Sequence, residues 1–111
     1  MRKRTTPRAK KAFAATGDPQ GMAALCNAYM EWGRVHNFSD HTIDHAFRYL
    51  GAFIAWAEAR GLTKPTEITK PILERYQRWL FHYRKQNGDP LSFSTQKRYL
   101  VPLRSWFRWL A

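Results

Sequence analysis

Hydroxyl, imidazole and cationic side chains gather on one face of each of two segments that are expected to be helical. They are His41, Thr42, His45 and Arg48 in the first segment, and Ser94, Thr95, Lys97, Arg98 and Arg104 in the second, whose face also carries Val101. The N-terminus of a helix attracts phosphate through its free N–H groups and the positive end of its dipole. Nearby hydroxyls and cations can hold a phosphate backbone, while Lys and Arg reach base edges in a groove wide enough for a helix. This pattern favours binding to a polyanion.

Catalysis and metal binding find much weaker support in the sequence. The acids are scattered without a convincing pair of carboxylates, and neither a Gly-rich phosphate loop nor a nucleophile elbow is present. His41 and His45 are four residues apart on one helix face, with Asp44 beside them. Structural zinc sites need four ligands, however, and no Cys or His partners follow at suitable spacings. We therefore predict no catalytic residue, no metal and no cofactor.

The two polar sets belong to segments that are built alike. A Ser-x-x-Thr pair begins each segment, at Ser39 and at Ser92, where the serine can cap the first N–H groups of a helix. Apolar residues then follow at the same offsets from each serine, +11, +14 and +17. They are Leu50, Phe53 and Trp56 in the first segment, and Leu103, Trp106 and Trp109 in the second. The repeat predicts two capped helices with aromatic inner faces.

Apolar residues at spacings of three and four predict an all-α fold of four helices in antiparallel hairpins. The helices are expected to run from Asp18 to about residues 35–37, from Ser39 to Gly61, from Thr69 to Asn87, and from Ser92 to the last residue, with a kink at Pro102. The inward positions are Met22, Leu25, Tyr29 and Trp32; Ile43, Phe47, Leu50, Phe53, Ile54, Trp56 and Ala57; Ile72, Leu73, Tyr76, Trp79, Leu80 and Tyr83; and Leu100, Leu103, Trp106, Phe107 and Leu110.

The chain of 111 residues fits one domain and carries a formal net charge of +11. Six of its 19 Lys and Arg residues lie within the first eleven positions, so residues 12–111 hold 13 cations against 8 acids, a net charge of +5. Such an excess favours a polyanionic partner. We expect a flexible basic arm over residues 1–17 and one folded domain over residues 18–111.

Cys26 is the single cysteine, so no intrachain disulfide is possible and a reduced, cytoplasmic setting is expected. It lacks the His and Asn pattern of a catalytic thiol and is predicted to be a small buried residue. No apolar run approaches the roughly 20 residues that span a bilayer, so no membrane partner is expected. The last helix reaches the final residue without a stop signal, which indicates a piece of a longer protein.

Several motifs of the chain are similar to one known family. Ser39-x-x-Thr42 with Leu50, Phe53 and Trp56 resembles the first half of the N-terminal, SAM-like core-binding domain of tyrosine recombinases, which include the phage integrases and the Xer group. The closing helix of that domain is similar to residues 91–100, LSFSTQKRYL, and 103–110, LRSWFRWL, and Ile68-Thr69 matches the start of the preceding helix. Ala46 departs from the family, which often has Tyr there, and Phe47 is expected to fill that volume.

The resemblance implies a four-helix SAM-like domain of two crossed antiparallel hairpins that clamps one face of a DNA half-site. It also implies that the helices beginning at Ser39 and Ser92 approach the major groove. The family's catalytic residues lie in a separate C-terminal domain, so this chain is expected to bind double-stranded DNA but neither cut nor join it. The isolated domain is expected to be a monomer, and the parent protein a tetramer on DNA.

Two functions remain open from the sequence. In the first, a DNA-binding module, Lys97, Arg98 and Arg104 contact phosphate or base edges, Ser94 and Thr95 position them, and the polar set around His41 and His45 plays a weaker, pH-sensitive part. In the second, a helical protein-interaction module, the basic surface meets an acidic partner. An RNA partner is a third and weaker option, because no RNA-binding signature appears.

Overall fold

The computed structural model describes residues 11–14 and 17–111, and these residues form an all-α structure. The four α-helices are α1 (Met22–Val35), α2 (Asp40–Glu58), α3 (Lys70–His82) and α4 (Phe93–Leu110), and a short 3-10 helix, η1 (Pro65–Glu67), connects α2 to α3. The predicted fold class and the predicted number of main helices are therefore confirmed.

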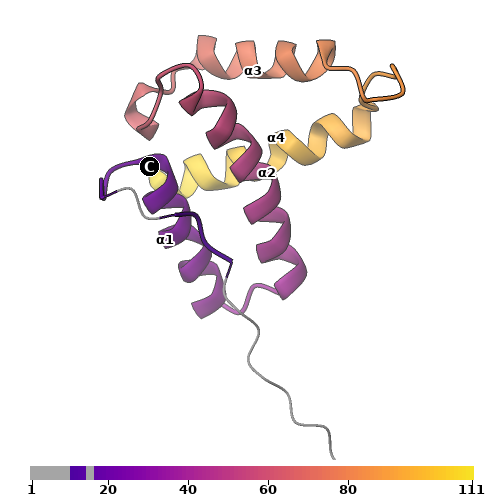
Figure 1. Cartoon of the computed structure of the whole chain (residues 1–111). Helices are drawn as coiled ribbons and strands as arrows, with labels where there is room; N and C mark the ends of the chain where they lie inside the picture. Colours follow the sequence, from indigo (N-terminus) through magenta and orange to yellow (C-terminus); the bar gives the residue numbers. More distant parts are fainter. Residues whose placement is uncertain (1–10, 15–16) are drawn as a thin grey trace, which may run out of the picture.

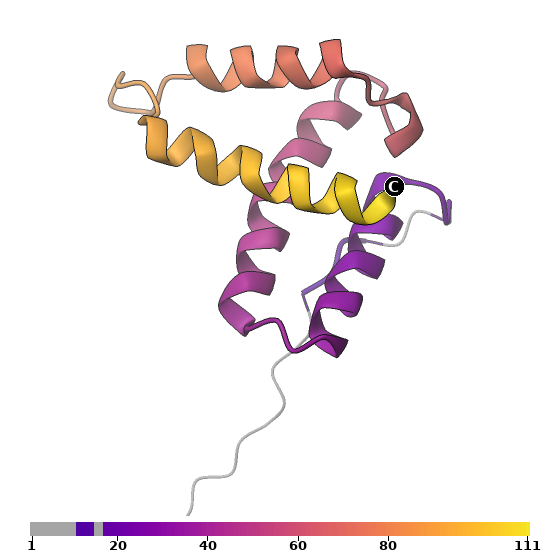
Figure 2. The ribbon, with the colours of Figure 1, turned by 180° about the vertical axis from the view of Figure 1, so that it is seen from behind.

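The helices form two hairpins that cross. Figures 1 and 2 show α1 and α2 side by side as one antiparallel pair, with α3 and α4 lying across them as the second pair. The most extensive contact between any two helices joins α2 to α4. The expected architecture of two crossed antiparallel hairpins is confirmed, and the two helices with the repeated Ser-x-x-Thr motif meet at the crossing.

The two serine caps have the same geometry. The Ser39 Oγ accepts a hydrogen bond from the Thr42 N–H at 3.1 Å, and the Ser92 Oγ accepts one from the Thr95 N–H at 3.2 Å. Each serine hydroxyl also lies within hydrogen-bond distance of its threonine hydroxyl, at 2.9 Å and 3.0 Å. Each cap satisfies one of the N–H groups that a helix start leaves without a partner, so the predicted starts of α2 and α4 are correct.

The ends of α1 and α2 share a second motif. Asn37 and Gly61 follow the two helices with positive φ angles of 64° and 78°, the left-handed conformation that Asn and Gly adopt most readily. In both cases the next N–H bonds back to a helical carbonyl in a Schellman motif. The bonds are Phe38 N–H to Gly33 O at 2.9 Å and Leu62 N–H to Ala57 O at 3.0 Å. The predicted role of Gly61 as a stop is confirmed.

The hydrophobic core lies where the hairpins cross. Leu50 and Phe53 of α2 and Leu103 and Trp106 of α4 occupy equivalent offsets, and all four are buried. At the third offset Trp56 is buried, whereas Trp109 at the end of α4 is only half-buried. The repeat in the sequence thus corresponds to a repeat in packing. Other side chains with almost no exposed surface are Met22, Cys26, Met30, Tyr76 and Leu80.

Two predicted helix bounds are wrong. The first helix begins at Met22 rather than at Asp18, because the Asp18 carboxylate accepts the Gln20 N–H at 2.9 Å and closes a turn ahead of the helix. The third helix ends at His82 instead of Asn87. Residues 84–90 fold back on themselves, with the Lys85 N–H donating to the Asp89 carbonyl at 2.8 Å. Helix α4 runs through Pro102 as one continuous helix.

Three aromatic side chains that were predicted to face inward are substantially exposed. Trp32 is 37%, Trp79 is 40% and Tyr83 is 43% exposed. Trp79 lies in the last turn of α3 and Tyr83 directly follows the helix, and their ring centroids are 5.4 Å apart. The helical period places Trp79 on the side of α3 that also carries the buried Tyr76 and Leu80, but within the described residues the end of that helix stays partly uncovered.

Residues 11–14, which were assigned to a flexible arm, pack onto the first hairpin. The Phe13 ring stacks on Phe47 of α2 with centroids 4.8 Å apart, and its backbone exchanges two hydrogen bonds with the Asn27 side chain of α1, at 2.8 Å and 3.1 Å. Arg34 donates to the Lys11 carbonyl at 3.0 Å. Aromatic packing and satisfied backbone groups hold this short segment in place. The rest of the expected arm, residues 1–10 and 15–16, lies outside the described residues.

Candidate nucleic-acid interface

The outward side of α4 carries a continuous cationic surface, which we call the α4 outer face. It consists of Ser94, Lys97, Arg98, Val101, Arg104, Ser105 and Arg108, and all seven side chains are exposed. Helix α4 contains no acidic residue. Within the part of the chain that the structure describes, no ion pair or hydrogen bond to protein is recorded for its four cations. Those cations can therefore meet an external anion without first losing an internal partner.

The start of α4 suits an anion. The Ser92 Oγ accepts a hydrogen bond from the Thr95 N–H at 3.2 Å, and the Ser92 carbonyl accepts one from the Gln96 N–H at 2.9 Å. Among the described residues, no acceptor is recorded for the N–H groups of Phe93 and Ser94. No carboxylate occupies the first turn, so the positive end of the helix dipole is not neutralised there.

The predicted threonines serve first as parts of the caps. The Ser92 hydroxyl donates to the Thr95 Oγ1, so the Thr95 hydroxyl proton remains available to another acceptor. Thr42 has the matching bond to Ser39, in which either oxygen can be the donor. The structure thus gives Thr42 and Thr95 a structural role, and any contact they make with a ligand is additional to that role.

The polar side chains of α2 lie partly in a hollow at the crossing. His41, Thr42 and His45 line a space of about 210 Å³ between α2 and α4. The two imidazole rings have centroids 4.4 Å apart. Arg48 points outward, with its guanidinium carbon 5.7 Å from the ring centre of Tyr49. The structure therefore brings the two histidines and Thr42 against the middle of α4, away from its capped start.

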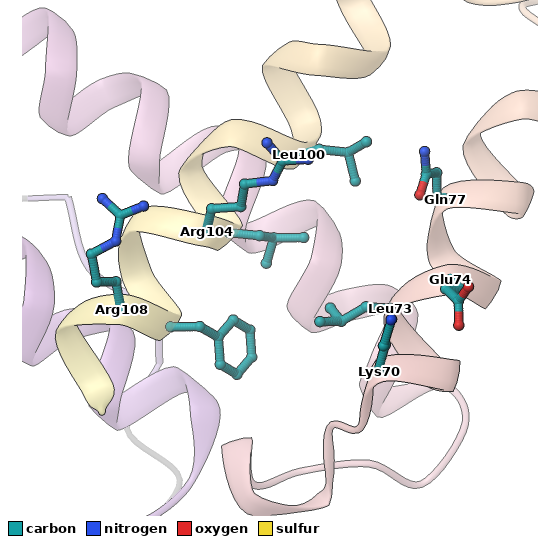
Figure 3. A pocket seen from close by; sticks show the side chains of 9 residues that line it. Lys70, Leu73, Glu74, Gln77, Leu100, Arg104 and Arg108 are labelled. Atoms are coloured by element: carbon teal, nitrogen blue, oxygen red, sulfur yellow. The ribbon is translucent and has the colours of Figure 1, made fainter.

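Arg104 lies on the side of α4 that faces α3, whereas the histidines lie near Val101 and Ser105. Arg104 lines a groove of about 360 Å³ between α3 and α4, together with Arg108. Figure 3 shows both arginines on the α4 wall of this groove and Lys70, Glu74 and Gln77 on the α3 wall. The candidate surface thus extends from the crossing, over the α4 outer face, to the rim of this groove.

Arg108 is a candidate that sequence reasoning missed. It follows Arg104 by four residues and Lys97 by eleven, so all three lie in one row along the helix. That spacing is visible in the sequence. Most residues predicted from the sequence cluster toward the capped ends of the two segments, whereas the exposed row of cations extends almost to the end of α4.

The nine predicted site residues do not form one cluster. Because the hairpins cross, the capped start of α2 and the capped start of α4 lie at different ends of the molecule (Figures 1 and 2). Thr42, His41 and His45 meet α4 near Val101, whereas Ser94, Thr95, Lys97 and Arg98 extend away from the crossing. A ligand that contacts all nine residues must therefore extend along α4 from its capped start to the crossing.

Several other cations have structural partners. Arg34 bonds to the Lys11 carbonyl, and one of its nitrogens lies 3.7 Å from a Glu31 oxygen. Arg60 donates to the Trp56 carbonyl at 2.8 Å with its guanidinium over the indole ring. Arg84 donates to the Phe81 carbonyl in the last turn of α3 and to the Tyr83 carbonyl that follows the helix. A part of the basic charge thus stabilises helix ends and loops.

Catalytic and metal chemistry gains no support from the described residues. Burial raises the pKa of the Cys26 thiol to about 12, so the thiolate is not formed near neutral pH. No three side chains of His, Cys, Asp or Glu within residues 11–14 and 17–111 come together as metal ligands. No helix in the described ranges is long and apolar enough to cross a membrane.

Comparison with known proteins identifies a related sequence. The chain is 44% identical over 84 residues to tyrosine recombinase XerC 2 of Ralstonia nicotianae. The match covers 76% of this chain and 24% of the length of that relative. No family model and no solved structure matches the chain. The identity extends over most of the four-helix fold, and the chain is a tyrosine recombinase-like domain.

Proposed function

We propose that this chain is the DNA-binding module of a site-specific tyrosine recombinase and that it clamps one face of a recombination half-site through α2 and α4. The observation that carries the proposal is the α4 outer face, where four cations without internal partners among the described residues line a helix that contains no acid. Such a row matches the charge of a phosphate backbone. The similarity to a tyrosine recombinase supports duplex DNA as the source of that phosphate.

In this proposal α4 enters the major groove with its capped end next to one strand. The N–H groups of Phe93 and Ser94 receive a phosphate, and Thr95 adds its hydroxyl. Lys97, Arg98 and Arg104, which were predicted from the sequence, contact phosphates or base edges, and Arg108 continues the row. On α2, the residues His41, Thr42, His45 and Arg48 make the second and weaker set of contacts.

The activity of the parent protein is part of the same proposal. The relative is named a tyrosine recombinase, so we propose that breaking and rejoining of DNA belongs to the parent protein and that this domain contributes binding only. The monomeric state of the isolated domain and the tetramer on DNA rest on the same family resemblance, and the proposed cytoplasmic location rests on the single cysteine as well.

Salt-dependent titration tests the DNA-binding proposal. The chain is titrated into fluorescent duplexes of about 30 base pairs at several salt concentrations, and anisotropy is measured. If about five phosphates are neutralised, the logarithm of the association constant should fall with the logarithm of salt concentration with a slope of about −4 to −5. Absence of binding at low salt, or an affinity independent of salt, would exclude the proposal.

The groove between α3 and α4 favours the second candidate function, a protein-interaction module. Leu73, Leu100 and Phe107 are among its lining residues, and Lys70 and Arg108 carry positive charge at its rim. An acidic peptide with apolar side chains matches that lining. Charge reversal at Lys97 and Arg98, which do not line the groove, separates the two functions: it abolishes DNA binding under the first and leaves peptide binding intact under the second.

A further inference from the structure

One apolar side chain interrupts the α4 outer face. Val101 is 52% exposed and is the ninth of the 18 residues of α4. Lys97 and Arg98 lie one helical turn before it, and Arg104 and Ser105 lie one turn after it. A single exposed apolar residue is common on protein surfaces and carries no meaning alone. The position of Val101 is unusual because every other member of the α4 outer face is polar.

Val101 also forms part of the hollow at the crossing of α2 and α4. The α4 side of that hollow is lined by Val101, Pro102 and Ser105, and the α2 side by His41, Thr42, His45 and Ala46, so the lining is part apolar and part polar. Its volume of about 210 Å³ leaves room for a small group. A methyl group attached to a polar partner therefore fits the hollow by size and by chemistry.

Duplex DNA presents such a group in its major groove. Thymine carries a C5-methyl group there, and apolar protein side chains in contact with that methyl distinguish thymine from the other bases. Cations on either side of Val101 can hold the two phosphate backbones that flank a groove, which leaves the centre of the helix facing the base edges. Val101 occupies that centre.

We propose that Val101 contacts the C5-methyl group of a thymine and makes the domain prefer thymine at one position of its binding site. This inference rests on the proposed function, since it requires α4 to enter the major groove. It assigns base selection to Val101, whereas the surrounding cations supply affinity. A β-branched residue with about half of its surface exposed also gains burial when it meets a methyl group.

Removal of one methyl group from the DNA tests this proposal. Duplexes that bind the chain are first selected from a random pool, and each thymine of the enriched duplex is then replaced in turn by 2′-deoxyuridine. We expect one replacement to weaken binding about 3- to 5-fold, the loss that one buried methyl group produces. Val101→Ala should weaken binding to the thymine duplex by a similar factor and bind the thymine and uracil duplexes equally well.

Arg48→Ala is the matched control, because Arg48 stands at the same offset from Ser39 as Val101 does from Ser92. It should weaken binding to both duplexes equally and keep their ratio. Both variants should melt at the temperature of the wild type. The proposal is overturned if selection enriches no sequence, if no thymine replacement matters, or if the Val101→Ala variant still distinguishes thymine from uracil. Any of those results would contradict the role of Val101 but not the proposed DNA binding. If the chain bound no duplex at all, both proposals would be wrong.

Discussion

Helices α2 and α4 are alike on their inner faces and unlike on their outer faces. Inside, residues 53 positions apart play the same parts: Ser39 and Ser92 cap, Leu50 and Leu103 are buried, and Phe53 and Trp106 are buried. Apolar residues at the same offsets give both helices the same packing. The shared pattern therefore accounts for the fold and carries little information about function.

The outer faces differ at nearly every equivalent position. Where α2 has Asp44, His45, Arg48, Gly51 and Ala55, α4 has Lys97, Arg98, Val101, Arg104 and Arg108. With histidine neutral, α2 carries three acids and one arginine, whereas α4 carries four cations and no acid. Because charge on a solvated face hardly affects helix packing, the difference points to what each face binds. We infer that α4 is the main binding helix.

The largest expected effect is a loss of stability that tests whether the inner faces of α2 and α4 pack alike. Phe53→Ala and Trp106→Ala each remove a fully buried ring from the crossing and should each lower the free energy of unfolding by about 3–5 kcal/mol. Chemical denaturation followed by circular dichroism measures both losses. If one variant lost less than about 1 kcal/mol, the two positions would not be structurally equivalent.

The next effect concerns Gly51, which stands in α2 where α4 has Arg104. A Cβ added at Gly51 would lie 2.9 Å from the Phe13 Cε1, so Gly51→Ala should destabilise the protein by about 1 kcal/mol. In a Phe13→Ala background the same change should stabilise it by about 1 kcal/mol, since Ala is the better helix former.

Thermal and chemical unfolding of the four proteins of this double-mutant cycle gives the coupling between the two positions. If Gly51→Ala lowered the free energy of unfolding equally with and without the Phe13 ring, the result would contradict the packing of residues 11–14 on α2. The cycle therefore also tests whether residues 11–14 belong to the folded domain.

Exchange of equivalent outer residues between α2 and α4 tests whether their charge difference determines how strongly each helix binds DNA. Arg98→His should weaken DNA binding about tenfold and reduce the magnitude of the salt slope by about one, because one cation contact is lost near neutral pH. His45→Arg should strengthen binding about threefold and increase that magnitude. Anisotropy titrations at pH 8 measure both variants. If His45→Arg strengthened DNA binding by the same factor by which Arg98→His weakened it, the two helices would contribute equally to DNA binding.

The last prediction concerns the two serine caps. Ser39→Ala and Ser92→Ala each remove the side-chain oxygen that accepts a backbone N–H, so each should cost about 1 kcal/mol of stability. Ser→Gly at the same positions should cost only a few tenths of a kcal/mol. A loss at one serine and none at the other, in melting experiments, would show that the two caps contribute unequally.

Local chemistry made much of the fold predictable. Ser39, Ser92 and Gly61 act within one helical turn of themselves, so their roles were correct from the sequence. The first helix start was wrong because Asp18 caps a turn that residue type alone does not distinguish from a helix cap. Helical spacing assigned Trp79 to the inner side of α3, but spacing cannot say whether another element reaches that end.

The candidate site was predictable only in part. Lys97, Arg98 and Arg104 were visible as outward cations, and the spacing to Arg108 was visible as well. The hollow at the crossing joins residues about 60 positions apart, such as Thr42 and Val101, and depends on the angle at which the hairpins meet. The docking of Phe13 likewise depends on contacts with Phe47, which lies far along the chain.

The most direct test of the central claim compares the salt slope of the wild type with that of the Lys97→Glu/Arg98→Glu variant on the same duplex. If the α4 outer face binds DNA, the magnitude of the slope should fall by about two, affinity should fall at least about 100-fold at low salt, and the melting temperature should not change. A variant that folds normally and keeps the wild-type affinity and slope would contradict the assignment of DNA binding to α4.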